Sequence, residues 1–275
     1  MNPRQNIMKD KKVIYDGREI DWGKTSADYS LYRPGYPNSF YDKLAALGIG
    51  LKGQRVLDLG TGTGVLARNF AKRGCKVTAV DISENQISAA QKLAKEERLD
   101  INFFVRAAES THLPDKAFDV ITAGSCWLYF DKSIIIPEVK RLLDPHGFLM
   151  KCSIVWLPYE DKIAQKTEEL ILRYNPHWTG AGFTFKPEIH IVPEWSLADF
   201  QMTSFHMYRV YIEFTYETWR GRIRACRGVG ASLLQKEIKE FDKEHAQLLN
   251  KIADEKFNIL HLIWFHVFQV KKPID

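Results

Sequence analysis

Short apolar runs separated by longer amphipathic stretches dominate the first half of the chain. Residues 55–59, 76–80, 101–106 and 118–123 are rich in Val, Ile, Leu, Phe and Ala and end at glycine or polar residues. Runs of this length and composition are typical of buried β-strands. Strands that alternate with helical segments predict an α/β fold with a parallel sheet. Three more strands are predicted at 148–155, 203–214 and 258–271.

The clearest helical signal follows the second predicted strand. A capping-box pattern begins at Ser83, and Ile87, Ala90 and Ala94 fall on one helical face. We therefore predict a helix over 83–98 that returns the chain to the third strand. Further helices are predicted from Val65 onward and over 37–47, 163–174, 216–227 and 233–254.

Four segments are predicted around one α/β core. Residues 1–36 form a polar N-terminal arm or cover, and residues 37–155 carry the core. Residues 156–199 are too long for an ordinary connection and contain a run rich in Gly, Pro and aromatic residues, which is typical of a lid over a substrate. Residues 200–275 supply strands and helices that complete the same domain.

The first predicted strand runs directly into a glycine-rich loop at 60–64. Gly60 and Gly62 lack side chains, so backbone amides approach a ligand closely, and the positive end of the helix from Val65 lies behind them. Asp81 ends the next strand, where a carboxylate about 20 residues past the glycines accepts both hydroxyls of a ribose. The pattern predicts a nucleoside site, and we expect the helix over 37–47 to cover its entrance.

The loop alone does not exclude a dinucleotide. The pattern G-x-G-x-x-G/A counted from Gly60 places bulky Val65 at its last position, but counted from Gly62 it places Ala67 there. Asp81 disfavours a 2′-phosphate, because two anions would face each other. A nicotinamide or flavin cofactor therefore stays an alternative on spacing.

The ends of the next two strands also carry candidate site residues. The third strand leads to Ala108 and Glu109, and the fourth leads to Ser125 and Trp127. Ligands of open α/β sheets bind at the carboxyl edge of the strands. We therefore expect these residues to lie near the glycine loop.

The order and spacing of these motifs resemble the class I S-adenosylmethionine-dependent methyltransferases. The matching motifs are VLDLGTGTG at 56–64, VD at 80–81, AESTHLP at 108–114 and FD at 118–119. Within that superfamily, four more motifs resemble a bacterial branch related to the trans-aconitate methyltransferases, over roughly residues 28–272. They are YRPGYP at 32–37, CW at 126–127, FD at 130–131 and WRGRIRA at 219–225. That branch often has His where this chain has Leu128, so no catalytic role is carried over to that position.

This resemblance implies a Rossmann-like, seven-stranded, mostly parallel sheet with helices on both faces, a lid between strands five and six, and an N-terminal cover. It implies S-adenosylmethionine as cofactor, S-adenosylhomocysteine as product, and no metal. The residues that it implies for cofactor binding are Tyr29, Arg33, Asp58, Gly60, Thr61, Gly62, Asp81, Ile82, Ala108, Glu109 and Ser125.

Individual roles follow for several of these residues. We expect Asp58 to accept hydrogen bonds from the backbone of the glycine loop and to reach the ammonium group of the cofactor. Tyr29 and Arg33 are expected to close over the cofactor, with Arg33 pairing with its carboxylate. Glu109 is expected to orient the adenine edge, whereas an exposed loop glutamate is the simpler alternative.

The acceptor side carries fewer signals. Trp127 and Tyr129 are predicted to line the methyl-transfer channel, because a sulfonium cation is attracted to aromatic faces; core packing is the alternative. Trp127, Arg222 and Arg224 are the predicted substrate contacts, with a solvated helix face as the alternative for the two arginines. No catalytic residue is assigned; the candidates are Trp127, Tyr129 and His177, and only His177 is nominated as a base. The arginines predicted to share one helical stripe are Arg220, Arg224 and Arg227.

Composition and charge limit the classes of partner that the chain is expected to bind. The formal net charge of +5 is mild and shows no basic block, which suits a small acidic substrate better than nucleic acid. The four cysteines lie far apart, so neither a zinc site nor a disulfide framework is indicated. The first residues lack the apolar segment of a signal peptide, and no apolar run approaches the ~20 residues of a membrane span. We expect a soluble cytoplasmic monomer or homodimer without nucleic-acid or membrane partners.

The sequence therefore predicts a methyltransferase that moves a methyl group in line from S-adenosylmethionine to a small, acidic molecule. One alternative is a non-catalytic module that binds S-adenosylmethionine. An RNA or protein methyltransferase is less favoured, because neither the charge pattern nor an extra domain supplies a docking surface. An oxidoreductase is the most distant alternative.

Overall fold

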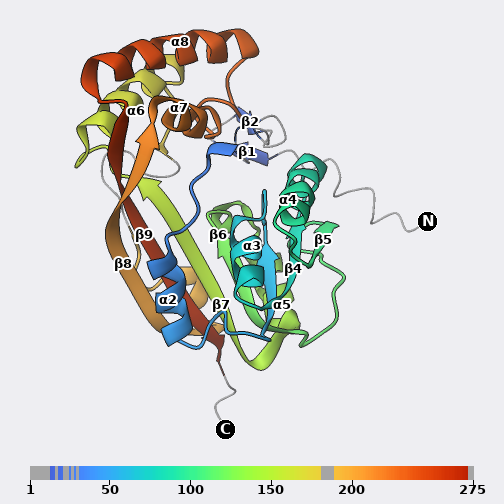
Figure 1. The fold of residues 1–275 in the computed structure, drawn as a ribbon. Coiled ribbons are helices and arrows are strands. Elements are labelled where there is room, and N and C mark those ends of the chain that lie inside the picture. Colours follow the sequence, from blue (N-terminus) through green and yellow to red (C-terminus); the bar gives the residue numbers. More distant parts are fainter. Residues whose placement is uncertain are drawn as a thin grey trace. The chain divides into compact units, whose positions relative to one another are not determined.

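The computed structural model describes residues 13–15, 18–20, 25, 28, 31–180 and 189–271 (Figure 1). These residues form two compact units. The core unit comprises 35–153, 190–207 and the chain from 264 onward. The helical unit comprises the chain up to 34, 154–189 and 208–263.

A seven-stranded sheet runs in the order β5-β4-β3-β6-β7-β9-β8. Its strands are β3 (Arg55–Leu59), β4 (Lys76–Asp81), β5 (Ile101–Val105), β6 (Phe118–Gly124), β7 (Leu143–Trp156), β8 (Phe200–Thr215) and β9 (Lys256–Val270). The neighbours β5/β4, β4/β3, β3/β6 and β6/β7 pair in parallel. The predicted seven-stranded, mostly parallel Rossmann-like sheet is confirmed. A separate antiparallel hairpin joins β1 (Val13–Tyr15) to β2 (Arg18–Ile20).

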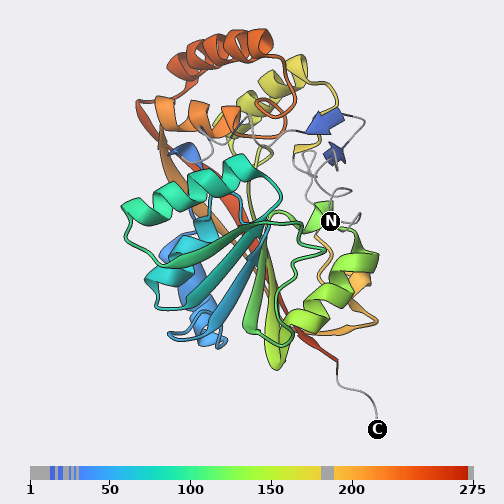
Figure 2. The same cartoon turned by 90° about the vertical axis from the view of Figure 1, so that its right-hand side faces the viewer.

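Helices cover both faces of the sheet within the core unit (Figures 1 and 2). They are α2 (Asn38–Ala46), α3 (Val65–Lys72), α4 (Glu84–Glu96) and α5 (Lys132–Leu142). The sequence analysis did not predict α5. Its local signal is Asp131, whose carboxylate accepts a hydrogen bond from the Ser133 amide at 2.9 Å and so caps the helix.

The sequence analysis predicted that the helix α2 covers the ligand entrance. In the structure α2 packs in the core instead. Its residues Phe40, Tyr41 and Leu44 are buried. The ring of Phe40 lies 5.5 Å from that of Phe265, and the ring of Tyr41 lies 5.7 Å from that of Phe70. Since Phe70 belongs to the last turns of α3, this contact lies at the end of α3 away from the glycine loop. An amphipathic helix is held by its apolar face, and that face points to the sheet.

Three helices make up most of the helical unit. They are α6 (Lys162–Tyr174), α7 (Tyr216–Arg224) and α8 (Gln235–Ile252). Trp219 is fully buried among them, and its indole N–H donates to the Thr167 hydroxyl at 3.1 Å. None of the described helices combines the length and apolarity needed to cross a membrane.

The segment predicted as one lid, residues 156–199, is divided between the two units. Its helical part, α6, buries Ala164 and Ile171 in the core of the helical unit. Residues 181–188 lie outside the described residues. From residue 190 onward the segment belongs to the core unit, where the ring of Trp195 lies 4.7 Å from that of Trp127. The predicted role as a substrate cover stays a prediction.

Replacing Phe70 with Ala tests the packing of α2 on α3. Phe70 is 1% exposed, so we expect Phe70→Ala to lower the free energy of unfolding by about 3–5 kcal/mol through the cavity that it leaves. Leu51→Ala serves as the control, because Leu51 is 45% exposed and its loss should cost about 0.5 kcal/mol. Urea denaturation of both variants measures the difference. Equal losses would contradict the packing.

Candidate functional site

The glycine loop adopts a backbone that favours glycine at three positions. Gly60, Gly62 and Gly64 have φ values of +60°, +57° and +78°. At Gly60 a Cβ atom would lie 2.9 Å from the Cys126 Sγ, closer than real contacts allow. The loop therefore needs glycine at Gly60 for its conformation and for the close approach of the segment after β6.

Asp81 joins the glycine loop to the end of β4. Its Oδ2 accepts the Gly62 amide at 2.8 Å, and its Oδ1 accepts the Ser83 amide at 2.9 Å. Burial raises the pKa of Asp81, and these amides oppose the rise. A carboxylate has about four acceptor positions, so a ligand can still donate to Asp81.

Asp58 is a buried carboxylate held by two hydroxyls. It is 2% exposed, and it accepts from the hydroxyls of Thr61 and Thr122, each at 2.6 Å. The prediction that it accepts from the backbone of the glycine loop is corrected: the loop contributes the Thr61 hydroxyl, and the backbone hydrogen bond to Asp58 comes from Ala67 on α3. Burial raises the pKa of Asp58 to about 6, and the charge of Asp81 adds to the rise while the two hydroxyls oppose it. A cationic ligand group beside Asp58 would stabilise its ionised form and so offset the rise of its pKa.

Two buried hydroxyls in this region have no partner among the described residues. They are Oγ1 of Thr63 and Oγ of Ser125. Ser125 also has a φ of +60°, uncommon for a residue with a side chain, and its amide donates to the Cys152 carbonyl at 2.8 Å. Buried polar atoms in native proteins are normally paired. These two hydroxyls therefore fit a polar ligand beside the glycine loop.

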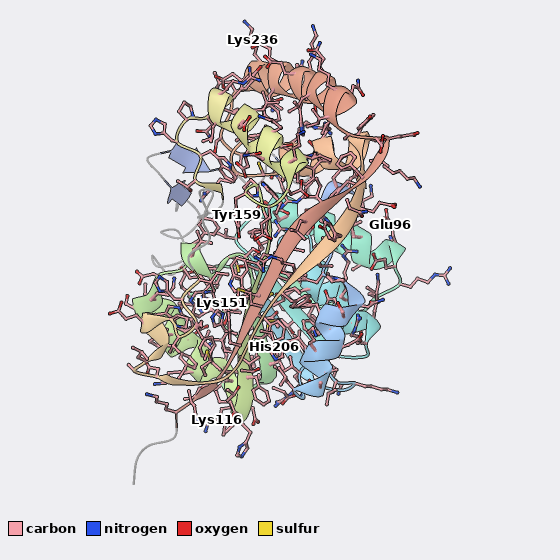
Figure 3. All side chains as sticks on the ribbon, turned by 90° about the vertical axis from the view of Figure 1, so that its left-hand side faces the viewer. Glu96, Lys116, Lys151, Tyr159, His206 and Lys236 are labelled. Atoms are coloured by element: carbon pink, nitrogen blue, oxygen red, sulfur yellow. The ribbon has the colours of Figure 1, made fainter. Side chains whose placement is uncertain are left out.

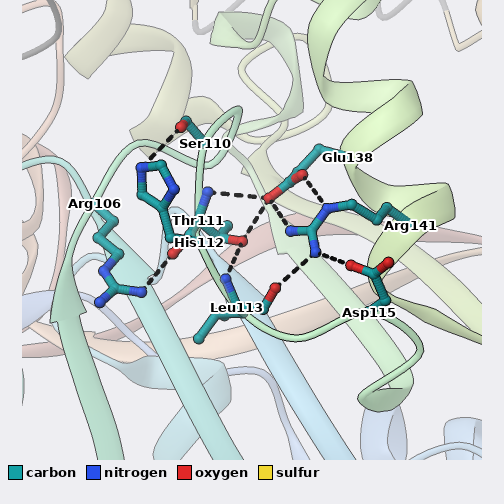
Figure 4. A network of polar contacts seen from close by, with 8 residues as sticks. All are labelled: Arg106, Ser110, Thr111, His112, Leu113, Asp115, Glu138 and Arg141. Atoms are coloured by element: carbon teal, nitrogen blue, oxygen red, sulfur yellow. Dashed lines mark hydrogen bonds and ion pairs between the residues drawn. The ribbon is translucent and has the colours of Figure 1, made fainter. Parts of the chain in front are cut away.

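A polar network fixes the loop that carries Ala108 and Glu109 (Figure 4). Glu138 on α5 accepts the amide of Thr111 at 3.0 Å and its hydroxyl at 2.6 Å. Arg141 donates to Glu138 and, at 2.7 Å, to the Leu113 carbonyl. Burial raises the pKa of Glu138, but the Arg141 and Thr111 hydrogen bonds outweigh it and leave the pKa lowered. The helix that the sequence analysis missed thus positions the predicted adenine loop.

Glu109 itself is half-buried at the end of this loop. Its Oε1 accepts the Asp131 amide at 3.2 Å. Ala108 is buried, and Ile82 is 43% exposed beside the capping loop after β4. Whether Glu109 orients an adenine edge stays a prediction.

The two aromatic candidates differ in burial. Trp127 is 3% exposed and packs with Phe130 and Trp195 in the apolar core. Its indole N–H is buried without a partner among the described residues. Tyr129 is half-buried in the same short 3-10 helix, Trp127–Tyr129. Packing explains most of the surface of Trp127, so a channel role stays a prediction for both.

The candidate substrate arginines have internal partners in the helical unit. Arg224 donates to Asp28 at 3.0 and 3.1 Å and to Asp242 at 2.8 Å. Arg222 is 6% exposed, with its guanidinium 4.8 Å from the centre of the Trp156 ring. The helix α7 ends at Arg224, so the predicted arginine stripe does not continue to Arg227. These contacts favour a structural role for both candidates, and a substrate role stays untested.

Three further predicted residues lie outside the core unit or outside the described residues. Tyr29 lies outside the described residues. Arg33 is half-buried and belongs to the helical unit, as does His177, which is exposed. Their predicted roles stay predictions.

Sequence reasoning assigned no site role to Thr122, Cys126, Lys132 or Lys151. Thr122 pairs in register with Asp58, a contact that follows from β6 lying next to β3. Both lysines follow the segment after β6 in sequence: Lys132 begins α5 and Lys151 lies on β7. Lys151 could have been noticed in the sequence, because it is the one charged residue in the predicted strand 148–155.

Residues 56–147 match the family model described as "Methyltransferase domain". A ubiquinone biosynthesis O-methyltransferase of Coxiella burnetii is 36% identical over 155 residues, covering 54% of this chain and 64% of that protein. For other curated relatives, the match covers 55% of the length of the relative. The chain therefore spans less than two thirds of the length of the curated relatives that it matches. These matches show a methyltransferase domain over residues 56–147. The trans-aconitate branch stays a prediction.

Solved structures share the fold at low sequence identity. A putative type II methyltransferase from Anaeromyxobacter dehalogenans has a TM-score of 0.60 and 19% identity, covering 86% of this chain and 97% of that chain. A methyltransferase from Geobacter sulfurreducens in complex with S-adenosylhomocysteine has a TM-score of 0.50 and 17% identity, covering 91% and 97%. Both support the Rossmann-like methyltransferase fold.

The raised pKa of Asp58 predicts a pH-dependent stability. A carboxyl group with a pKa of about 6 when folded and 3.8 otherwise binds more protons in the folded state, so stability falls as pH rises from about 4 to 6. Two pKa units correspond to roughly 3 kcal/mol. We expect Asp58→Asn to remove this fall in urea denaturation series, whereas Asp100→Asn, at an exposed position, should keep it. A parallel pH course for wild type and Asp58→Asn would contradict the assignment.

Gly60→Ala tests the close approach of Cys126 to the loop. Gly53→Ala is the matched control, because Gly53 has a φ of +88° with nothing within 4 Å of an added Cβ atom. Both should lose about 1–2 kcal/mol of stability from backbone strain. Only Gly60→Ala should also weaken S-adenosylhomocysteine binding, by about tenfold or more, in calorimetry. Equal affinities for S-adenosylhomocysteine in the two variants would contradict the placement of the glycine loop in the binding site.

Proposed function

We propose that this protein transfers a methyl group from S-adenosylmethionine to a small molecule. The observation that carries the proposal is the position of Asp81 between the glycine loop and the end of β4, with acceptor positions left for a ribose. The match of residues 56–147 to the methyltransferase domain supports it.

The residues of the core unit fit this cofactor in kind and number. Asp81 would accept the ribose hydroxyls, and Asp58 would face the ammonium group. The unpartnered hydroxyls of Thr63 and Ser125 would pair with polar atoms of the amino-acid portion. The exposed side chain of Ile82 would cover one face of the adenine.

The cofactor, when bound, supplies a methyl group already activated on a sulfonium centre. The protein then has to align the acceptor and to exclude water. Asp58 and Asp81 would hold one end of the cofactor. The segment after β6, from Ser125 to Tyr129, would border its other end. A base is needed only where the acceptor must first lose a proton.

A small-molecule acceptor is supported by the relative from Coxiella burnetii, which is named for ubiquinone biosynthesis. The mild net charge of +5 suits a small acidic acceptor. A cytoplasmic monomer or homodimer stays our expectation.

A non-catalytic module that binds S-adenosylmethionine is the second candidate. It is favoured by Leu128, which is 46% exposed where the related branch often has His. A turnover screen with acids, phenols, amines and thiols separates the two, since the module would bind S-adenosylmethionine and consume none.

Calorimetry tests the proposed cofactor. We expect binding of S-adenosylmethionine and S-adenosylhomocysteine but not of NAD. Asp81→Ala should weaken S-adenosylhomocysteine binding by about 1.5–3 kcal/mol, the range for hydrogen bonds to a charged group. The control Asp100→Ala removes an exposed carboxylate and should leave affinity unchanged. Tighter binding of NAD, or full affinity in folded Asp81→Ala, would refute the placement.

A further inference from the structure

Lys151 is a cation within an otherwise apolar part of the central sheet. It lies on β7 in register with Ala123 of β6, one residue before the level at which β6 ends. Its neighbours along β7, Met150 and Cys152, are buried, whereas Lys151 is only half-buried. Lys151 (Figure 3) therefore lies close to the level at which β6 ends, and the residue is not fully buried.

The charge of Lys151 is uncompensated among the described residues. Within 31–180 and 189–271 its ammonium makes neither an ion pair nor a hydrogen bond. Burial, and then the positive charge of Lys132, lower the pKa of Lys151; no carboxylate is among the groups that shift it. A partly buried lysine without an acid is costly unless a partner arrives, because buried charges are normally paired.

A second lysine lies against the segment after β6. The Lys132 ammonium donates to the carbonyl of Trp127 at 2.7 Å and to that of Phe130 at 2.5 Å. Two of its three protons are thereby used. Lys132 lies near Glu109 and Asp131, whereas Lys151 has no such neighbour. Lys151 is therefore the main anion-binding candidate, and Lys132 adds positive potential beside it.

The sheet order places this cation on the acceptor side. The ribose acid Asp81 ends β4, and β7 lies three strands away, roughly 14 Å at about 4.8 Å per strand. The nucleoside occupies the β4 side of the edge in the proposed function. The acceptor must then lie toward β6 and β7, where Lys151 stands.

We propose that Lys151 binds an anionic oxygen group, a carboxylate or a phosphate, of the methyl acceptor. This inference rests on the proposed methyltransferase function. It moves the acceptor's anionic contact from Arg224, which is paired with Asp28 and Asp242, to a lysine in the core unit.

Ligand-observed NMR titration of the protein loaded with S-adenosylhomocysteine tests the proposal with benzoate, phenyl phosphate and neutral benzamide as probes. One anionic probe should bind at least about tenfold more tightly than benzamide, in line with a hydrogen bond to a charged group. Preference for benzoate identifies a carboxylate, and preference for phenyl phosphate identifies a phosphate.

Four variants test whether the positive charge of Lys151 causes the preference for anionic probes. Lys151→Met keeps the length of the side chain and should abolish the preference, and Lys151→Gln serves where Lys151→Met does not fold. Lys151→Arg should retain the preference. Lys92→Met, at an exposed position on α4, should behave as wild type.

Two results would overturn the inference: benzamide binding as tightly as both anions, or an unchanged preference in folded Lys151→Met or Lys151→Gln. A lysine that only fills space would give the second result. Calorimetry with S-adenosylhomocysteine on the same samples separates the two proposals. Absent binding in wild type refutes the methyltransferase function, whereas normal binding without anion preference refutes only the role of Lys151.

Discussion

The hydrogen bond from the Gly62 amide to the Asp81 carboxylate is the contact on which the candidate site depends. It fixes a loop whose three glycines have positive φ to the end of the neighbouring strand. The same carboxylate accepts the Ser83 amide, which ties it to the start of α4. Because Asp81 is held from both sides, its remaining acceptor positions have fixed directions, and a ribose would meet a preorganised partner.

Charge is distributed unevenly along the carboxyl edge of the sheet. Two carboxylates, the buried Asp58 and the half-buried Asp81, lie on β3 and β4, and the charge of Asp81 helps to raise the pKa of Asp58. On the side of β6 and β7 lie the cations Lys132 and Lys151, and the carboxylates of Glu109 and Asp131 lie near Lys132 only. Such an edge suits a ligand whose cationic end faces the acids, together with an acceptor whose anionic end faces the lysines.

Local patterns in the sequence predicted the strands of the core and the glycine loop, because buried parallel strands and left-handed glycines leave strong signals. The partners of Asp58 were not predictable from local pattern, since Thr122 is adjacent only through the β3–β6 pairing. α5 was missed, although its cap at Asp131 is visible in the sequence. The arginines of α7 looked like surface charges or ligand contacts, and only the fold reveals Asp28 and Asp242 as their partners.

A crystal structure of the protein grown with S-adenosylhomocysteine tests the central claim most directly. The account predicts both ribose hydroxyls within hydrogen-bonding distance of the Asp81 carboxylate and the adenosine beside the loop that carries Glu109. It also predicts the Gly62 amide still donating to Asp81. An adenosine bound elsewhere, or a ribose without contact to Asp81, would contradict it.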